Sequence, residues 1–381
     1  MVATWRIEVL LRKDVTSSAV MEMSLRTMTE RYLIGIGPTP PGKPTPGTRI
    51  QALAFLSRQL CTGDLSRGGR GHKDRRSDAA MRPPTHWVGR EEQTMTTVTA
   101  PMIRARKGGA KIRMTTAYDF PTARIADRAG ADIILVGDSV ANVVLGHDDT
   151  LSVDVDTMVH HTAAVVRAEP RALIVGDMPW MSYHVSPEET VVNAARLVRD
   201  GGASAVKLEG GRKRVEMIEA VIDAEVPVMG HLGLTPQSVK AMGGYRIQGK
   251  EAQAAYEMIS DAIALVDAGV FSIVLEGVPD RVAQVITAEV PVPTIGIGAG
   301  AGCDGQVLVI HDVLGLGGGD YLPKFVRPYA NLADDAVEAL ERFFDDIEAG
   351  AFPSADETYH MADESFEILR GLSEGETIVE F

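Results

Sequence analysis

The chain has 381 residues, of which 45% are hydrophobic and 24% are charged, a globular composition long enough for one large or two ordinary domains. Its 38 basic and 52 acidic residues give a net charge of −14, which argues against a general nucleic-acid-binding protein. Two cysteines exclude a disulfide scaffold and a cysteine-rich zinc site, so we expect a protein of the reducing cytoplasm. The sequence contains no run of about 18 apolar residues, so we expect no transmembrane helix.

The charge is divided unevenly along the chain. Residues 1–94 contain 15 basic and 9 acidic residues, a net of +6, whereas residues 95–381 carry a net of −20. Residues 34–49 are rich in Pro, Gly and Thr, which is typical of a linker. We predict that residues 1–94 are a largely disordered or non-native extension and that residues 95–381 form the folded domain. Early acidic residues and the lack of an apolar segment fit a signal peptide poorly. A basic arm for nucleic acid is the alternative.

From residue 111 onward, short β-rich runs alternate with helical segments. The runs are apolar nearly throughout, as expected for strands of a parallel sheet that is covered on both faces. The predicted strands are residues 112–118, 132–137, 172–177, 205–209, 226–231, 272–276, 294–298 and 307–311.

The segments between these strands carry helix start and stop signals. Ser186 precedes Pro187 and two acidic residues, which predicts a capped helix start. A further helix is predicted from about residue 251 to 268. Eight strand–helix units over about 240 residues predict a (β/α)8 barrel, an α/β fold. A doubly wound sheet is the competing architecture.

Polar residues gather where the predicted strands end, and that end of a barrel carries the active site. Three of them, Asp138, Asp177 and Glu209, are carboxylates after successive strands. Oxygen ligands without cysteine suit Mg²⁺ better than Zn²⁺. We therefore predict a magnesium site that polarises a carbonyl group. Helix capping and internal ion pairs are the structural alternatives for these acids.

Three more residues suggest roles in binding and proton transfer. Lys207 lies two residues before Glu209 and should share its strand face. A buried lysine needs a partner or an anionic ligand, so we predict a substrate-binding cation, with a structural ion pair as the alternative. Glu276 ends an apolar strand and is a candidate general base, with a salt bridge at the barrel rim as the alternative. His231 fits a metal ligand, an acid/base group or a hydrogen-bonded pocket residue.

Together, the strand-end motifs resemble the ketopantoate hydroxymethyltransferase (3-methyl-2-oxobutanoate hydroxymethyltransferase) family. The resemblance covers about residues 102–353, and GHLGLTPQ is close to diagnostic. The motifs are TTAYD (115–119), VGDS (136–139), GHDDT (146–150), VKLEGG (206–211), GHLGLTPQ (230–237), GGYRIQG (243–249), VLE (274–276), IGIGAG (295–300) and DGQVLVIHD (304–312). Residues 1–94 and the acidic tail after Pro353 depart from the pattern.

The resemblance implies a Mg²⁺-dependent barrel enzyme of pantothenate and coenzyme A biosynthesis. Its substrates would be 3-methyl-2-oxobutanoate and 5,10-methylenetetrahydrofolate, and its products 2-dehydropantoate and tetrahydrofolate. It further implies a homo-oligomer, often a decamer in that family, with no nucleic-acid or membrane partner. The implied metal ligands are Asp138, Asp177 and Glu209; the substrate contacts are Asp138, Ser139, Asp177 and Lys207; and the catalytic residues are Glu276 and His231.

Two other functions stay open at this point. One is a different Mg²⁺ barrel enzyme acting on 2-oxo acids, such as a lyase or phosphonomutase of the isocitrate lyase type, although the chain lacks the cysteine-containing loop of those enzymes. The other is a barrel kept as a binding or assembly module. An erased base or metal acid would favour that module, and no matched position is substituted.

Overall fold

The computed structural model describes residues 96–317 and 322–373. The chain divides into two units, residues 1–89 and residues 90–381, and the described residues all belong to the second. The predictions made for residues 1–94 therefore lie outside the described part of the chain.

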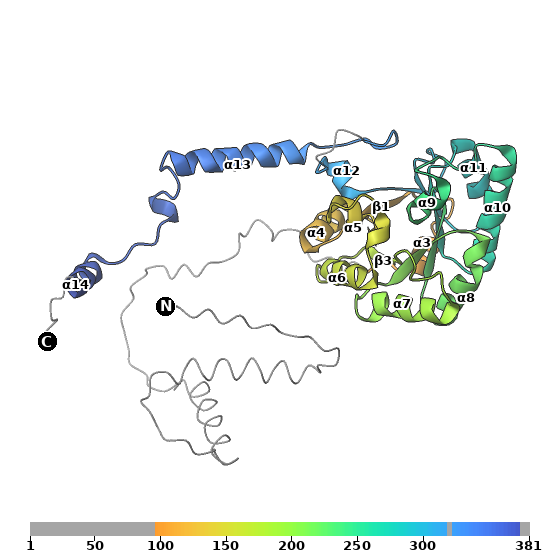
Figure 1. Ribbon diagram of the computed structural model, residues 1–381, viewed down its shortest axis with the longest axis horizontal. Helices are drawn as coiled ribbons and strands as arrows, with labels where there is room; N and C mark the ends of the chain where they lie inside the picture. Colours follow the sequence, from red (N-terminus) through yellow and green to blue (C-terminus); the bar gives the residue numbers. More distant parts are fainter. Residues whose placement is uncertain (1–95, 318–321, 374–381) are drawn as a thin grey trace, which may run out of the picture. The chain divides into compact units, whose positions relative to one another are not determined.

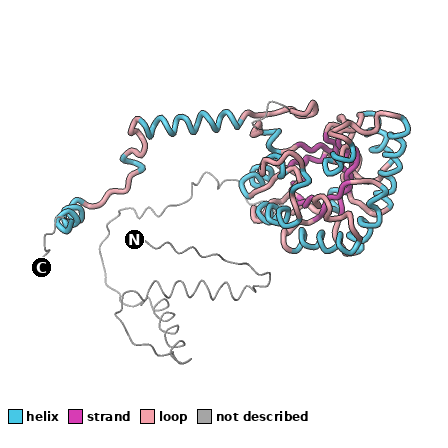
Figure 2. The backbone as a smooth tube through the Cα atoms, in the orientation of Figure 1, coloured by secondary structure: helices cyan, strands magenta, loops and turns pink. Residues whose placement is uncertain are grey.

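Eight parallel strands close into a barrel in the order of the sequence, and helices surround it (Figures 1 and 2). The strands are β1 (Ile112–Thr116), β2 (Ile133–Val136), β3 (Leu173–Asp177), β4 (Ala205–Glu209), β5 (Val228–Gly233), β6 (Ser272–Glu276), β7 (Thr294–Ile297) and β8 (Gly305–Leu308). The pairing of β1 with β8 closes the barrel. The predicted (β/α)8 architecture is confirmed, and the doubly wound sheet is excluded.

The longer helices of the barrel lie between successive strands. They are α4 (Phe120–Ala129), α6 (Val155–Val166), α7 (Pro187–Arg199), α8 (Val215–Asp223), α10 (Ala252–Asp267) and α11 (Asp280–Glu289). Shorter elements are α3 (Ala100–Arg104), α5 (Val140–Val143), η3 (Thr150–Ser152), η4 (Arg212–Arg214), η5 (Pro236–Ser238), α9 (Val239–Met242) and α12 (Ile310–Leu314). The predicted cap is confirmed, since the Ser186 side chain accepts a hydrogen bond from the backbone N–H of Glu189 at 3.2 Å.

Side chains of the strands alternate between the barrel interior and the layer of helices. In β2, Ile133 and Leu135 belong to the interior cluster, whereas Ile134 and Val136 pack in the outer cluster. The same period of two places Ala205 of β4 inside the barrel. It follows that residues two and four positions after Ala205 face the interior as well.

The eighth strand was predicted too far along the chain. It spans Gly305–Leu308 rather than residues 307–311, and His311 lies in α12. Gly305 and Gln306 have low β-propensity, but they pair with Ile112 and Arg113 of β1. Closing the barrel therefore outweighs local preference at this strand.

The C-terminal segment continues beyond the barrel as helices. These are α13 (Leu332–Glu348), η6 (Ala355–Glu357) and α14 (Asp363–Ser373). None of the three has a buried residue. Within residues 96–317 and 322–373, no helix is long and apolar enough to cross a membrane.

Candidate active site

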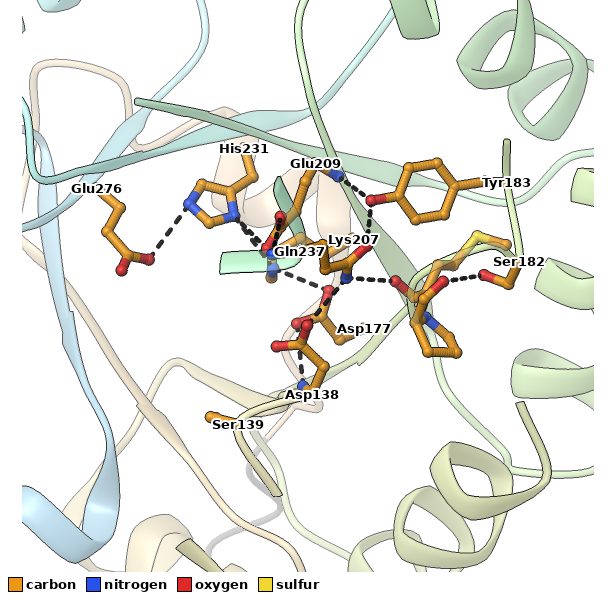
Figure 3. A network of polar contacts seen from close by, with 12 residues as sticks. Asp138, Ser139, Asp177, Ser182, Tyr183, Lys207, Glu209, His231, Gln237 and Glu276 are labelled. Carbon is orange, nitrogen blue, oxygen red and sulfur yellow. Dashed lines mark hydrogen bonds and ion pairs between the residues drawn. The ribbon is translucent and has the colours of Figure 1, made fainter. Parts of the chain in front are cut away.

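The residues selected from the sequence meet at the carboxyl ends of five successive strands. Asp138 and Ser139 follow β2, and the others lie at or within two residues of the carboxyl ends of β3 to β6 (Figure 3). Register places them on one side, because Asp177 pairs with Lys207 and Glu209 pairs with His231. Asp138, Asp177, Lys207, Glu209 and His231 are all buried.

Lys207 forms the ion pair at the centre of the site. Its Nζ lies 2.8 Å from Asp177 Oδ1 and 3.4 Å from His231 Nδ1. Burial alone would lower the pKa of Lys207, but the charges of Asp177 and Glu209 outweigh burial and raise that pKa. Lys207 is therefore a buried cation among the acids, and the predicted shared face with Glu209 is confirmed.

Of the three carboxylates, Asp138 is the one whose ionised form is least favourable. Burial raises its pKa well above the ordinary value, and the charges of Asp177 and Glu209 raise it further. Its backbone N–H donates to Asp177 Oδ2 at 3.2 Å, so the two acids are held side by side. Neither caps a helix through its side chain, and a bound cation would relieve their mutual repulsion.

His231 lies between Glu209 and Glu276. Its Nδ1 is 3.3 Å from Glu209 Oε1, and its Nε2 is 3.3 Å from Glu276 Oε2. Burial and the charge of Lys207 would lower the pKa of His231, but contact with both glutamates raises it to about 9. His231 therefore links the buried cluster to Glu276, which is partly exposed.

Ser139 is positioned by a tyrosine rather than by a helix terminus. It precedes α5 but makes no capping hydrogen bond with its side chain. Its Oγ lies 2.7 Å from the hydroxyl oxygen of Tyr118, a buried residue two positions after β1. The Ser139 hydroxyl is thereby fixed beside Asp138.

The donor set suits a hard divalent cation with open coordination positions. Two buried carboxylate oxygens are held only by ion pairs: Glu209 Oε1 with His231, and Asp177 Oδ1 with Lys207. Across residues 96–317 and 322–373, no group of three or more His, Cys, Asp or Glu side chains is arranged to hold a metal ion. Mg²⁺ usually takes one or two carboxylates and completes its shell with water and substrate, so the residues present fit it.

Residues 97–355 match the family model of ketopantoate hydroxymethyltransferase. The chain belongs to this family. It is 54% identical over 277 residues to 3-methyl-2-oxobutanoate hydroxymethyltransferase of Syntrophobacter fumaroxidans, covering 73% of this chain and 98% of the relative. Identity to the enzyme of the same name from Moorella thermoacetica is 54% over 263 residues, covering 69% and 97%.

Membership of the ketopantoate hydroxymethyltransferase family makes the chain a hydroxymethyltransferase, and the resemblance inferred from the motifs is confirmed. A solved structure of phosphonopyruvate hydrolase is 15% identical, with a TM-score of 0.45 and coverage of 74% of this chain and 97% of that one. A likeness this distant carries no argument about activity.

Two buried residues of this hydroxymethyltransferase site were missed by the sequence prediction. Gln237 donates to Asp138 Oδ2 from Nε2 at 3.0 Å, and Tyr183 donates from its hydroxyl to Gln237 Oε1 at 2.5 Å. Gln237 ends the GHLGLTPQ motif, which was the available signal. Tyr183 lies in the segment after β3 and carried no signal of its own.

Proposed function

We propose that the chain transfers a hydroxymethyl unit to 3-methyl-2-oxobutanoate and so produces 2-dehydropantoate in pantothenate biosynthesis. The named relatives support the reaction. The observation that carries the proposal is the buried row from Asp177 through Lys207 to His231, which also contacts Glu209 and ends at the partly exposed Glu276 (Figure 3). Such a row supplies a cation for an anionic substrate at one end and a base at the other.

We propose 5,10-methylenetetrahydrofolate as the donor and Mg²⁺ as the cofactor. The reaction then balances with one water: the oxo acid gains the one-carbon unit at C3, water supplies the hydroxyl oxygen, and tetrahydrofolate leaves. Asp138, Asp177 and Glu209 would hold Mg²⁺. When bound, Mg²⁺ supplies Lewis-acid polarisation of the 2-oxo group.

The protein's own residues bind the oxo acid and move its proton. Lys207 and the Ser139 hydroxyl would bind the carboxylate and 2-oxo oxygens of the substrate, because Lys207 is fixed at the centre of the site and Ser139, next to Asp138 in the chain, is held by Tyr118. Glu276 would remove the proton from C3, which is acidified by the adjacent carbonyl. His231, 3.3 Å from Glu276 Oε2, would hold that carboxylate in place. The new carbon–carbon bond then forms at C3.

Glu276→Gln tests the base. Without a proton acceptor, exchange of the C3 hydrogen for deuterium should slow by about 100-fold or more, while binding of the oxo acid is kept. The measurement is NMR of 3-methyl-2-oxobutanoate in D₂O with Mg²⁺ and no folate, so it reports proton removal alone. Glu289→Gln, at the end of α11, is the matched control. Normal exchange in Glu276→Gln would overturn the assignment.

Assays of the wild-type chain with and without folate distinguish a hydroxymethyltransferase from a lyase. Release of tetrahydrofolate should require 3-methyl-2-oxobutanoate together with the methylene donor. Turnover of other 2-oxo acids in the absence of any folate would instead favour the lyase class.

A further inference from the structure

Gln237 contacts two of the three clustered carboxylates, although it carries no charge. Its Nε2 donates to Asp138 Oδ2 at 3.0 Å and to the carbonyl oxygen of Met178 at 2.9 Å. Its backbone N–H donates to Glu209 Oε2 at 3.1 Å. One buried residue therefore fixes one oxygen on each of two acids that come from different strands.

The turn after β5 explains how one residue reaches both acids. Gly233 has φ +97°, and a Cβ there would lie 2.2 Å from the carbonyl oxygen of Glu276, so the chain can turn closely against β6 only with glycine. Pro236 then begins η5. The first N–H groups of a helical turn have no partner within the turn, and that of Gln237 is directed to Glu209.

Tyr183 fixes the orientation of the Gln237 amide. Its hydroxyl donates to Gln237 Oε1 at 2.5 Å and accepts from the backbone N–H of Glu209 at 3.3 Å. A flipped amide would put its oxygen against Asp138 Oδ2 and the Met178 carbonyl, which are both acceptors. Only the observed orientation satisfies every polar atom of the amide (Figure 3).

The second oxygen of Glu209 is thereby placed. With Oε2 held by Gln237, Oε1 is directed to His231 Nδ1, 3.3 Å away. Carboxylates that repel one another would rotate apart without such donors. Residues that orient the ligands of a metal typically change affinity by about 10- to 100-fold when replaced.

We propose that Gln237, oriented by Tyr183, is a positioning residue that holds Asp138 and Glu209 in the arrangement that binds the divalent cation. The inference rests on the proposed function, in which these acids bind Mg²⁺. Gln237 does not touch substrate in this role and acts through the two acids.

Gln237→Met and Tyr183→Phe test the proposal. Gln237→Met keeps the side-chain length but removes the amide donor. Tyr183→Phe removes only one hydroxyl, so it still tests the proposal if Gln237→Met fails to fold. Calorimetric titration of the full chain with Mg²⁺ alone should show affinity about 10-fold or more weaker for Gln237→Met and a smaller loss for Tyr183→Phe. The double variant should bind only slightly more weakly than Gln237→Met, because Tyr183 acts mainly through Gln237 and otherwise contacts the backbone N–H of Glu209.

A matched control separates positioning from general destabilisation. Thr162→Val removes the buried hydrogen bond from Thr162 Oγ1 to the Met158 carbonyl within α6 and should leave Mg²⁺ affinity unchanged. Wild-type affinity in both Gln237→Met and Tyr183→Phe would overturn this inference and leave the proposed function standing. A wild-type chain that binds no Mg²⁺ would overturn the proposed metal site and this inference together.

Discussion

At the scale of single residues, one buried cation lies among acids that would otherwise repel one another. Lys207 contacts Asp177 at 2.8 Å, and the charge of Glu209 also acts on it. Burial raises the pKa of Asp177, and the nearby Lys207 opposes that increase. The cluster is thus balanced only in part by the protein, which leaves room for a second positive charge.

Lys207→Met should destabilise the protein by removing that balance. Loss of one partner of a buried ion pair typically costs about 3–5 kcal/mol, so we expect the free energy of unfolding to fall by about 3 kcal/mol in urea titrations. Activity should also be lost. Added Mg²⁺ should raise the melting temperature of the variant more than that of the wild type, because it offsets the uncompensated acids. A variant as stable as the wild type would contradict this account. Thr162→Val is again the control, because it removes a buried hydrogen bond without removing a charge.

At the scale of elements, most strands were predictable from the sequence, and the eighth strand was the exception. Strands such as β4 and β6 are continuous apolar runs, and both were predicted with the correct ends. In β8, Gly305 and Gln306 carry no such signal, because their pairing with β1 depends on a residue almost 200 positions away.

The site followed the same division between local and distant signals. Asp177, Glu209 and Glu276 were predictable because each ends an apolar strand, and every barrel brings those ends together. Gln237 and Tyr183 were not, because their hydrogen bonds join loops 54 residues apart. The GHLGLTPQ motif marked the neighbourhood of Gln237 but not its contacts, and Tyr183 carried no signal of its own.

A buried aspartate joins the loops at the start of the barrel strands. Asp304 accepts hydrogen bonds from Lys107 Nζ at 2.9 Å and from the backbone N–H groups of Gly108 and Thr294 at 3.0 and 2.9 Å. Burial alone would raise the pKa of Asp304, but these donors lower it below the ordinary value. The ionised carboxylate therefore stabilises the fold.

Asp304→Asn should lower the free energy of unfolding by about 2–3 kcal/mol at pH 7, because the NH₂ group of the amide would face Lys107 or a backbone N–H, which are also donors. A lowered folded pKa contributes stability above the unfolded pKa of about 3.9 and loses it as pH falls through the folded value. The difference from wild type in urea titrations should therefore narrow below about pH 4. Asp200→Asn, at an exposed pair with Arg199, should change stability by less than about 0.5 kcal/mol. A difference that is independent of pH would contradict the role of the charge.

At the scale of the whole molecule, most of the negative charge has no part in the site. Residues 95–381 have a net charge of −20, and only Asp138, Asp177, Glu209 and Glu276 are placed in the proposed chemistry. The remaining acids lie largely on exposed helices, where charge favours solubility. α13 is an exception, because it combines acidic residues with an apolar stripe.

We propose that this stripe is a contact between copies of the chain. Six apolar side chains of α13 are exposed, and they recur at helical spacing. They are Leu332, Val337, Leu340, Phe343, Phe344 and Ile347. Isolated exposed apolar residues are common, but a contiguous stripe indicates an interaction surface.

Leu340→Asp should therefore shift the chain to a smaller assembly, because it places a charge in the middle of the stripe that a second copy would cover. Sedimentation velocity at matched protein concentration measures the change, and we expect at least a two-fold fall in the mass of the main species. Asp345→Asn, on the opposite side of the same helix, should leave the mass unchanged. An assembly whose mass is the same in Leu340→Asp and in wild type would show that α13 is not the contact, and a monomeric wild type would contradict the oligomer itself.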